Sequence, residues 1–226
     1  MTRTTWIAGM SLIAALLLAA GNGCTQKAAG PAAQRVTSPD DDYFAAGAGK
    51  APTLKTRYAM ARVLAAQGKD DQCVFILEQL IRERPQCLPA YSDLAELYMR
   101  HHRLEDAVNL LKTGLRVAEQ QDPVLVNNLG MCRMIQGNYE VALSAFVKAD
   151  TLAPSDARFK ANRAAALGML GRYDEALDQY LQVLPPADAH FNLGVICEAR
   201  KDLERAQEEY RLANDLADTD SQEYEL

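Results

Sequence analysis

From residue 54 onward the chain repeats itself, and this repeat constrains the fold more than any other feature. The run Gly137-Asn138-Tyr139-Glu140-Val141-Ala142 recurs 34 residues later as Gly171-Arg172-Tyr173-Asp174-Glu175-Ala176. A second run, Asn128-Leu129-Gly130, recurs as Asn192-Leu193-Gly194. A period in the thirties is typical of arrays of helix pairs, in which each pair buries its apolar face by stacking on its neighbours. The sequence therefore predicts one helical array rather than two separate domains.

The repeating part divides into five units, and each carries the same pair of positions in its second half. The units are 54–87, 88–122, 123–156, 157–186 and 187–220. The first position of the pair is small: Cys73, Ala107, Ala142, Ala176 and Ala206. The position four residues later is large and mostly apolar: Leu77, Leu111, Phe146, Tyr180 and Tyr210. A four-residue step keeps both side chains on one face of a helix, and the small one lets a second helix approach closely.

These units resemble the tetratricopeptide repeat, a family of helix–turn–helix units of 34 residues. The resemblance covers 54–220 and implies an all-α, right-handed superhelical solenoid of about five repeats. His102 stands where the turn of the second unit usually has Gly, so a residue with a side chain is expected near positive φ. Pro185-Pro186 predicts a shortened second helix in the fourth unit. Arg133 and Arg163 occupy places that are normally apolar.

The resemblance also predicts where the array ends. In the family, two positions of each second helix pack onto the next unit, and in the fifth unit these are the polar Gln207 and Asn214. A terminal repeat needs a polar outer face, so the fifth unit is expected to be the C-terminal cap. Residues 221–226 are expected to form an acidic tail, with fraying from Asp218 onward.

The N-terminus reads as an export signal. Residues 6–20 form an uncharged, mostly apolar run that is shorter than the ~20 residues of a membrane-spanning helix and fits a signal peptide. Gly21-Asn22-Gly23-Cys24 resembles the cleavage box of bacterial lipoproteins, although Gly21 and Asn22 depart from its usual residues. The resemblance implies a signal peptide over 1–23, lipidation of Cys24, and a lipid anchor facing the periplasm, with the outer membrane favoured. Ordinary secretion and a retained anchor are the alternatives.

Residues 24–53 connect this signal to the array. They are rich in Gly, Pro, Ala and polar residues, which predicts a flexible tether that reaches ~30 Å. Tyr43 and Phe44 are exceptions, because they are large enough to fold back and cover the first helix pair.

Composition excludes several functions. The net charge is −6, and the chain beyond residue 53 holds 20 basic and 27 acidic side chains, which is the wrong sign for nucleic-acid binding. No catalytic or dinucleotide-binding motif occurs, and the three His residues lack the spacing of metal ligands on a helix. The chain is therefore expected to be non-catalytic, without cofactor or metal. The acidic pairs, such as Glu208-Glu209, are expected at helix starts or on outer faces, and the cysteines of the array are expected to be buried thiols.

The remaining candidate is a surface for partners. The family's first helices line a concave groove, and the sixth place of each unit points into it; here that place holds Asn128, Asn162 and Asn192 in the last three units. Asn amides offer a donor and an acceptor to a peptide main chain. Other groove candidates are Arg62, Arg100, Met131, Met134 and Arg158. The Met side chains serve either as an apolar anchor or as partly buried packing.

Three functions compete. The lipobox, tether and repeats resemble the TadD-type lipoproteins of tight-adherence pilus assembly, which implies a scaffold with a secretin or other pilus components as partners. The second is a general periplasmic adaptor or chaperone that holds extended protein segments. The third is an enzyme or the regulatory subunit of an enzyme, and no motif in the sequence supports it.

Overall fold

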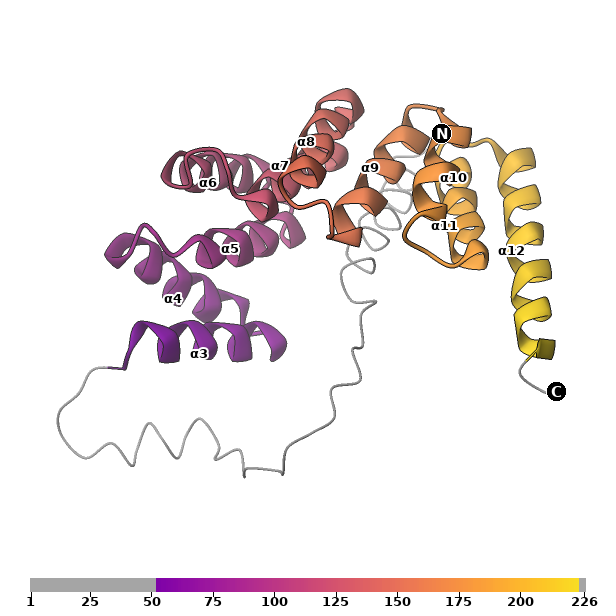
Figure 1. The fold of residues 1–226 in the computed structure, drawn as a ribbon. Helices are drawn as coiled ribbons and strands as arrows, with labels where there is room; N and C mark the ends of the chain where they lie inside the picture. The colour runs from indigo at the N-terminus through magenta and orange to yellow at the C-terminus, as the bar shows by residue number, and fades with distance from the viewer. Residues whose placement is uncertain (1–51, 224–226) are drawn as a thin grey trace, which may run out of the picture. The chain divides into compact units, whose positions relative to one another are not determined.

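The computed structural model describes the backbone of residues 52–223 and the side chains of residues 52–217. Within this range the chain forms ten helices and no strand (Figure 1). In chain order they are α3 (Leu54–Ala66), α4 (Asp70–Glu83), α5 (Leu88–Arg100), α6 (Leu104–Val117), α7 (Pro123–Ile135), α8 (Tyr139–Leu152), α9 (Ala157–Met169), α10 (Tyr173–Leu181), α11 (Pro186–Ala199) and α12 (Leu203–Glu223). The five predicted helix–turn–helix units are confirmed.

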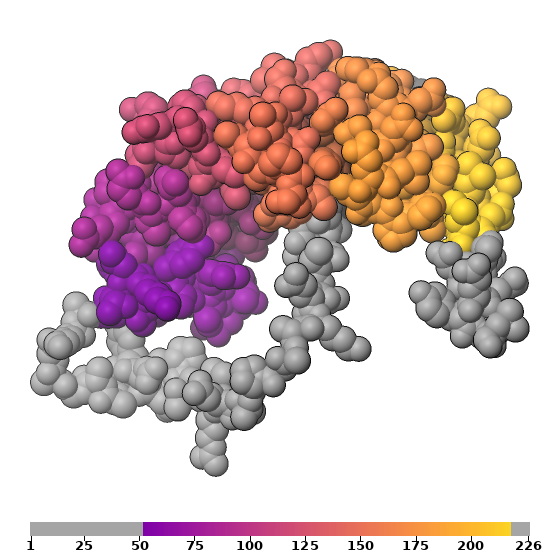
Figure 2. All heavy atoms as spheres, in the orientation of Figure 1, coloured from indigo at the N-terminus to yellow at the C-terminus, as the bar shows by residue number. Residues whose placement is uncertain are grey.

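The helices belong to two compact units. In the first, which ends at Ala118, α4 lies against α3 and α5, and α6 lies against α5. In the second, which begins at Glu119, each helix from α7 to α12 packs on the next, and α9 also contacts α11. Side chains fill the space between successive helices within each unit (Figure 2). Within each unit, successive hairpins stack on one another, as the repeat predicts.

The small residue of each second helix lies where the paired helices meet. Cys73, Ala107, Ala142, Ala176 and Ala206 are all at most 3% exposed. Glycines allow a still closer approach from the first helix of a pair. A Cβ added at Gly130 would lie 2.6 Å from Cε1 of Phe146, and one at Gly194 would lie 2.7 Å from the ring of Tyr210. At these two crossings the paired helices therefore pack Gly against an aromatic ring, at a distance that no larger residue permits.

The turns between paired helices use the left-handed conformation. His102 has φ 58°, as predicted, and Gly68, Gly137 and Gly171 hold the same place in their units. Lys201 also has φ 67°, which the sequence reasoning missed. Glycine adopts this region freely, whereas a side chain makes it costly. The turns at His102 and Lys201 are therefore the strained members of the set.

Two predictions concern the far end of the array. The shortened helix is confirmed, because α10 has nine residues whereas α8 has 14. The prediction of fraying from Asp218 is wrong: α12 continues to Glu223 and also takes in the start of the expected tail. Gln207 and Asn214 are exposed on α12, and no described helix packs beyond it. This arrangement agrees with a polar C-terminal cap.

Several sequence predictions lie outside the described residues. They include the signal peptide over 1–23, the lipidated Cys24, nearly all of the tether over 24–53, and the last three residues of the tail. Among the helices of the described range, none is both long enough and apolar enough to cross a membrane.

Candidate functional site

The predicted groove residues fall on the first helix of each pair, in both compact units. Arg62 on α3 and Arg100 on α5 are exposed and belong to the first unit. The others belong to the second unit: Asn128, Met131 and Met134 on α7, Arg158 and Asn162 on α9, and Asn192 on α11. Because α9 contacts both α7 and α11, the second unit brings the larger part of the predicted set onto three neighbouring helices.

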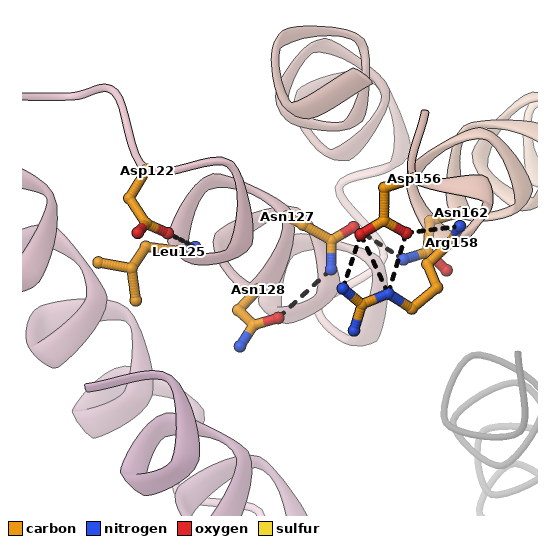
Figure 3. Close-up of polar contacts among 7 residues, drawn as sticks. All are labelled: Asp122, Leu125, Asn127, Asn128, Asp156, Arg158 and Asn162. Atoms are coloured by element: carbon orange, nitrogen blue, oxygen red, sulfur yellow. Dashed lines mark hydrogen bonds and ion pairs between the residues drawn. The ribbon is translucent and has the colours of Figure 1, made fainter. Parts of the chain in front are cut away.

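A chain of three side-chain amides links α7 to α9. Asn162 Nδ2 donates a hydrogen bond to Asn127 Oδ1 at 2.8 Å, and Asn127 Nδ2 donates to Asn128 Oδ1 at 3.3 Å (Figure 3). Asn162 is 4% exposed and Asn127 is 8% exposed. The predicted residues Asn128 and Asn162 are therefore connected, but only through Asn127, which the sequence reasoning did not single out.

The sequence contained a signal for Asn127. Asn127 stands directly before Asn128, which holds the sixth place of its unit. Of these two adjacent amides, only one can lie on the face that the sixth place occupies, and the other must lie on a different face of the helix. Side chains 100° apart on a helix cannot occupy the same face, and a buried amide needs a hydrogen-bonding partner. Asn127 finds that partner in Asn162, 35 positions later and so one repeat along the chain.

One oxygen of this amide chain has no hydrogen-bond donor among the described residues. Asn162 Oδ1 is buried, and within the described residues it accepts no hydrogen bond. A buried acceptor without a donor costs about 1–3 kcal/mol, so such atoms are few in folded proteins. Asn162 Oδ1 is therefore the unsatisfied acceptor at the end of this amide chain.

Arg158 is engaged at the start of α9. Its Nη2 lies 2.6 Å from Asp156 Oδ2, and its Nε donates to Asp156 Oδ1 at 3.0 Å (Figure 3). Asp156 also caps the helix, because its Oδ1 accepts the backbone N–H of Arg158. The Arg158 guanidinium lowers the pKa of Asp156, and Asp156 in turn raises the pKa of Arg158. Arg158 thus stabilises the end of α9 next to the amide chain.

The methionines of α7 are packed inside. Met131 is 6% exposed and Met134 is 3% exposed. Of the two alternatives for these side chains, packing is the one their burial favours. Asn192 on α11 is partly exposed, and it stands one repeat beyond Asn162.

The first unit carries charged and polar groups on α3 and α5. Tyr58 donates to Asp93 Oδ2 at 2.7 Å, and desolvation together with this bond raises the pKa of Tyr58. Asp70, at the start of α4, accepts from His101 at 2.7 Å, and Arg100 lies 3.6 Å from it. Asp70 lies in the first turn of α4, as predicted, and these contacts join the turns of two successive units.

The prediction for Glu209 is wrong. It was placed on an outer face, but its residue is only 2% exposed. His190 Nδ1 on α11 lies 2.7 Å from Glu209 Oε2, and Arg205 Nε donates to Glu209 Oε1 at 2.8 Å. Burying a carboxylate is costly in free energy unless it is paired and hydrogen-bonded in this way. The pattern of the last helix alone does not show this, because the partner on α11 is 19 positions away.

The described residues bring no group of three or more His, Cys, Asp or Glu side chains into a metal-binding arrangement. Cys73, Cys132 and Cys197 are buried free thiols, and Cys87 is partly exposed. Burial raises the pKa of Cys197 to about 11, so this thiol stays protonated at neutral pH. Buried thiols were the prediction, and three of the four agree with it.

Comparison with known proteins agrees with this geometry. Models of the tetratricopeptide repeat match residues 74–125, 133–187 and 187–220. The TPR repeat-containing thioredoxin TTL4 of Arabidopsis thaliana is 34% identical over 83 residues, which are 34% of this chain and 12% of that protein. The chain therefore spans about an eighth of the length of this curated relative.

Solved structures show the same fold. A crystal structure of the MamA protein has a TM-score of 0.57 at 16% identity and covers 76% of this chain and 96% of its own. YrrB, described as a TPR protein with an unusual peptide-binding site, has a TM-score of 0.54 at 21% identity and covers 73% of this chain and 86% of its own. Together, the ten helices, the small residues at their crossings and the three matched segments show that this chain is built of tetratricopeptide repeats.

Proposed function

We propose that helices α7, α9 and α11 bind extended segments of partner proteins, with Asn162 as the central contact. Tetratricopeptide-repeat domains bind protein or peptide partners, and the proposal places that activity on a specific group of this chain. The observation that carries it is the buried Oδ1 of Asn162, which has no donor among the described residues. A peptide N–H supplies the missing donor.

The amide chain favours main-chain recognition over side-chain recognition. Asn127 and Asn128 use their amides to orient one another and Asn162, so Asn162 Oδ1 is held in one direction before a ligand arrives. Preorganisation of this kind reduces the entropic cost of binding. Every non-proline residue of a partner carries the N–H that this atom accepts, so tolerance of sequence is expected.

The cellular setting is a separate part of the proposal. The Gly23-Cys24 junction supports a lipoprotein whose array is tethered to the envelope and faces the periplasm. There it would act as a scaffold in the assembly of a pilus or secretion machine, with a secretin or another pilus component as the partner. A general envelope adaptor or chaperone is the alternative, and a partner pool of many unrelated proteins would favour it.

Peptide binding is tested with a library of unstructured 12-residue peptides on a solid support. We expect the chain to bind a broad subset of the peptides, and the Asn127→Ala/Asn162→Ala variant to lose most of this binding. Asn214→Ala is the matched control, since Asn214 is an exposed helical Asn on α12. Equal binding by the wild type and by Asn127→Ala/Asn162→Ala would contradict the proposed site.

The anchor is tested by fractionating cells that produce the Cys24→Ser variant. A lipoprotein requires the thiol of Cys24, so we expect this variant to leave the membrane fraction while Cys87→Ser stays in it. Retention of Cys24→Ser in the membrane would contradict the anchor without bearing on peptide binding. Proteins that co-purify with the wild type after cross-linking would distinguish one envelope machine from many clients.

A further inference from the structure

The N-terminal hairpin has an apolar face that no described element covers. A shallow hollow of ≈ 460 Å³ lies between α3 and α4, and its lining includes Met60, Leu64, Phe75 and Ile76. Phe75 is 58% exposed and Met60 is 39% exposed. Scattered exposed apolar residues are ordinary, but here they converge on one groove between two helices.

The repeat shows what kind of neighbour this groove lacks. Within the first unit α4 packs on α5, and within the second unit α8 packs on α9, so inner hairpins receive the helix that precedes them. No described helix precedes α3. The two ends of the array therefore differ: the C-terminal cap exposes Gln207 and Asn214, whereas the N-terminal hairpin exposes Phe75 and Met60.

We propose that residues 40–44 of the same chain occupy this hollow, with Tyr43 and Phe44 on its apolar floor, and so form the N-terminal cap of the array. Tyr43 and Phe44 are the only aromatic residues between Cys24 and Pro52. Pro52 itself lines the hollow, so the chain enters the described fold beside the groove. This inference does not depend on peptide binding by α7, α9 and α11.

Chain length permits the contact. Phe44 lies eight positions before Pro52, and eight steps of ~3.3–3.6 Å along the chain span at most ~29 Å. Helix α3 has 13 residues and is therefore ~20 Å long. The intervening residues 45–51 are small apart from one Lys, which lets the chain turn back onto the hairpin.

A polar group in the hollow also lacks a partner. Arg57 lines it and pairs with Glu83 through its terminal nitrogens, while its buried Nε has no acceptor among the described residues. Asp40, Asp41 and Asp42 directly precede the aromatic pair. A carboxylate or a main-chain carbonyl of this segment would accept the Nε–H as the rings enter the hollow.

The tethered segment has an advantage over a second copy of the chain. Short flexible linkers give effective concentrations in the millimolar range, about a thousandfold above a protein at micromolar concentration. A second copy would also have to bring its own equally exposed face to the same small hollow. The occupant supplied in cis therefore prevails unless its affinity for the groove is far lower.

Hydrogen–deuterium exchange of the purified full chain tests the proposal. We expect Tyr43→Ser/Phe44→Ser to speed amide exchange in α3 and α4 at least fivefold, with no change in α11 and α12. Val36→Ser is the control, since Val36 belongs to the same tether and lies farther from α3 in the sequence. Phe75→Ser should give the same acceleration, and combining it with Tyr43→Ser/Phe44→Ser should add little, because both remove one contact.

The result that overturns the proposal is unchanged exchange in Tyr43→Ser/Phe44→Ser. If protection of α3 and α4 also rises between 1 and 50 µM protein, the occupant is a second copy; if it does not, the hollow is open to solvent. Misfolding does not obscure the result, because the tether variants leave every residue of the helical array intact.

Discussion

The crossing of α7 and α8 at Gly130 gives the sharpest test of how the repeats pack. A Cβ at this position would lie 2.6 Å from Cε1 and 2.9 Å from Cδ1 of Phe146, whereas carbon atoms pack best at about 3.5–4.0 Å. Phe146 is 0% exposed, so its ring is enclosed by other atoms of the protein. Gly130→Ala must therefore separate the helices or strain the ring.

Two opposed effects set the magnitude. Overpacking a well-filled core costs about 1–3 kcal/mol, while replacing Gly by Ala inside a helix gains about 1 kcal/mol. Because the overlap is close to 1 Å against an enclosed ring, we expect the upper half of the range, a net loss of about 1–2 kcal/mol. Urea denaturation followed by circular dichroism at 222 nm measures this loss.

A double-mutant cycle identifies its cause. Phe146→Leu removes the ring edge, so in that background Gly130→Ala should be neutral or stabilising, with a coupling of at least about 1 kcal/mol. Gly168→Ala is a graded comparison, because its Cβ would meet the aliphatic Ile196 Cγ2 at 2.9 Å, and it should cost less. A Gly130→Ala variant as stable as the wild type, or equally destabilised with and without the Phe146 ring, would refute the packing argument.

Three further predictions concern single contacts. Asp156→Ala removes the cap of α9 and should lower the free energy of unfolding by about 0.5–2 kcal/mol at neutral pH. Since Arg158 lowers the pKa of Asp156, the difference in stability between the variant and the wild type should persist above the ordinary carboxyl pKa and vanish as pH falls through the lowered pKa. A difference that stays constant down to strong acid would contradict this prediction. Arg163→Leu leaves Asp150 without its 3.3 Å partner and should cost about 1–3 kcal/mol, most of which Asp150→Leu/Arg163→Leu should restore; an equally unstable double variant would mean that the pair is not a unit. His102→Gly relieves a φ of 58° and should raise the free energy of unfolding by about 0.5–1 kcal/mol, so thermal unfolding at or below the wild-type temperature would contradict the strain.

The fold was predictable because the repeat specifies it many times over. The small residue at Ala142 and the large one at Phe146 recur at every unit, so the helix pairs follow from residues a few positions apart. The nine-residue α10 followed from Pro185-Pro186 for the same local reason. The extent of α12 did not, since acidic composition alone does not show where a terminal helix stops.

The polar contacts were harder to predict, because each depends on a partner in another helix. Arg163 stood out as a charged residue at a normally apolar place, yet only the structure shows that it pairs with Asp150. Asn128 was predicted as a groove residue and Asn127 was not, because the hydrogen bond between Asn127 and Asn162 joins residues 35 positions apart and cannot be read from the local sequence. The repeat pattern predicts the helix face on which a residue lies, but it does not show which of two adjacent amides points toward a partner on the next unit.

The most direct test of peptide binding at Asn162 is a cycle between Asn162→Ala and methylation of the ligand's backbone. A peptide selected by the wild-type chain is synthesised with one N-methyl group at each position in turn, and its Kd is measured by titration calorimetry. If Asn162 Oδ1 accepts a main-chain N–H, one N-methyl position should weaken binding to the wild type by about 2–10-fold, the net value of one hydrogen bond, and have no effect on Asn162→Ala. An N-methyl series whose losses are the same in both proteins would show that Asn162 does not contact the peptide main chain.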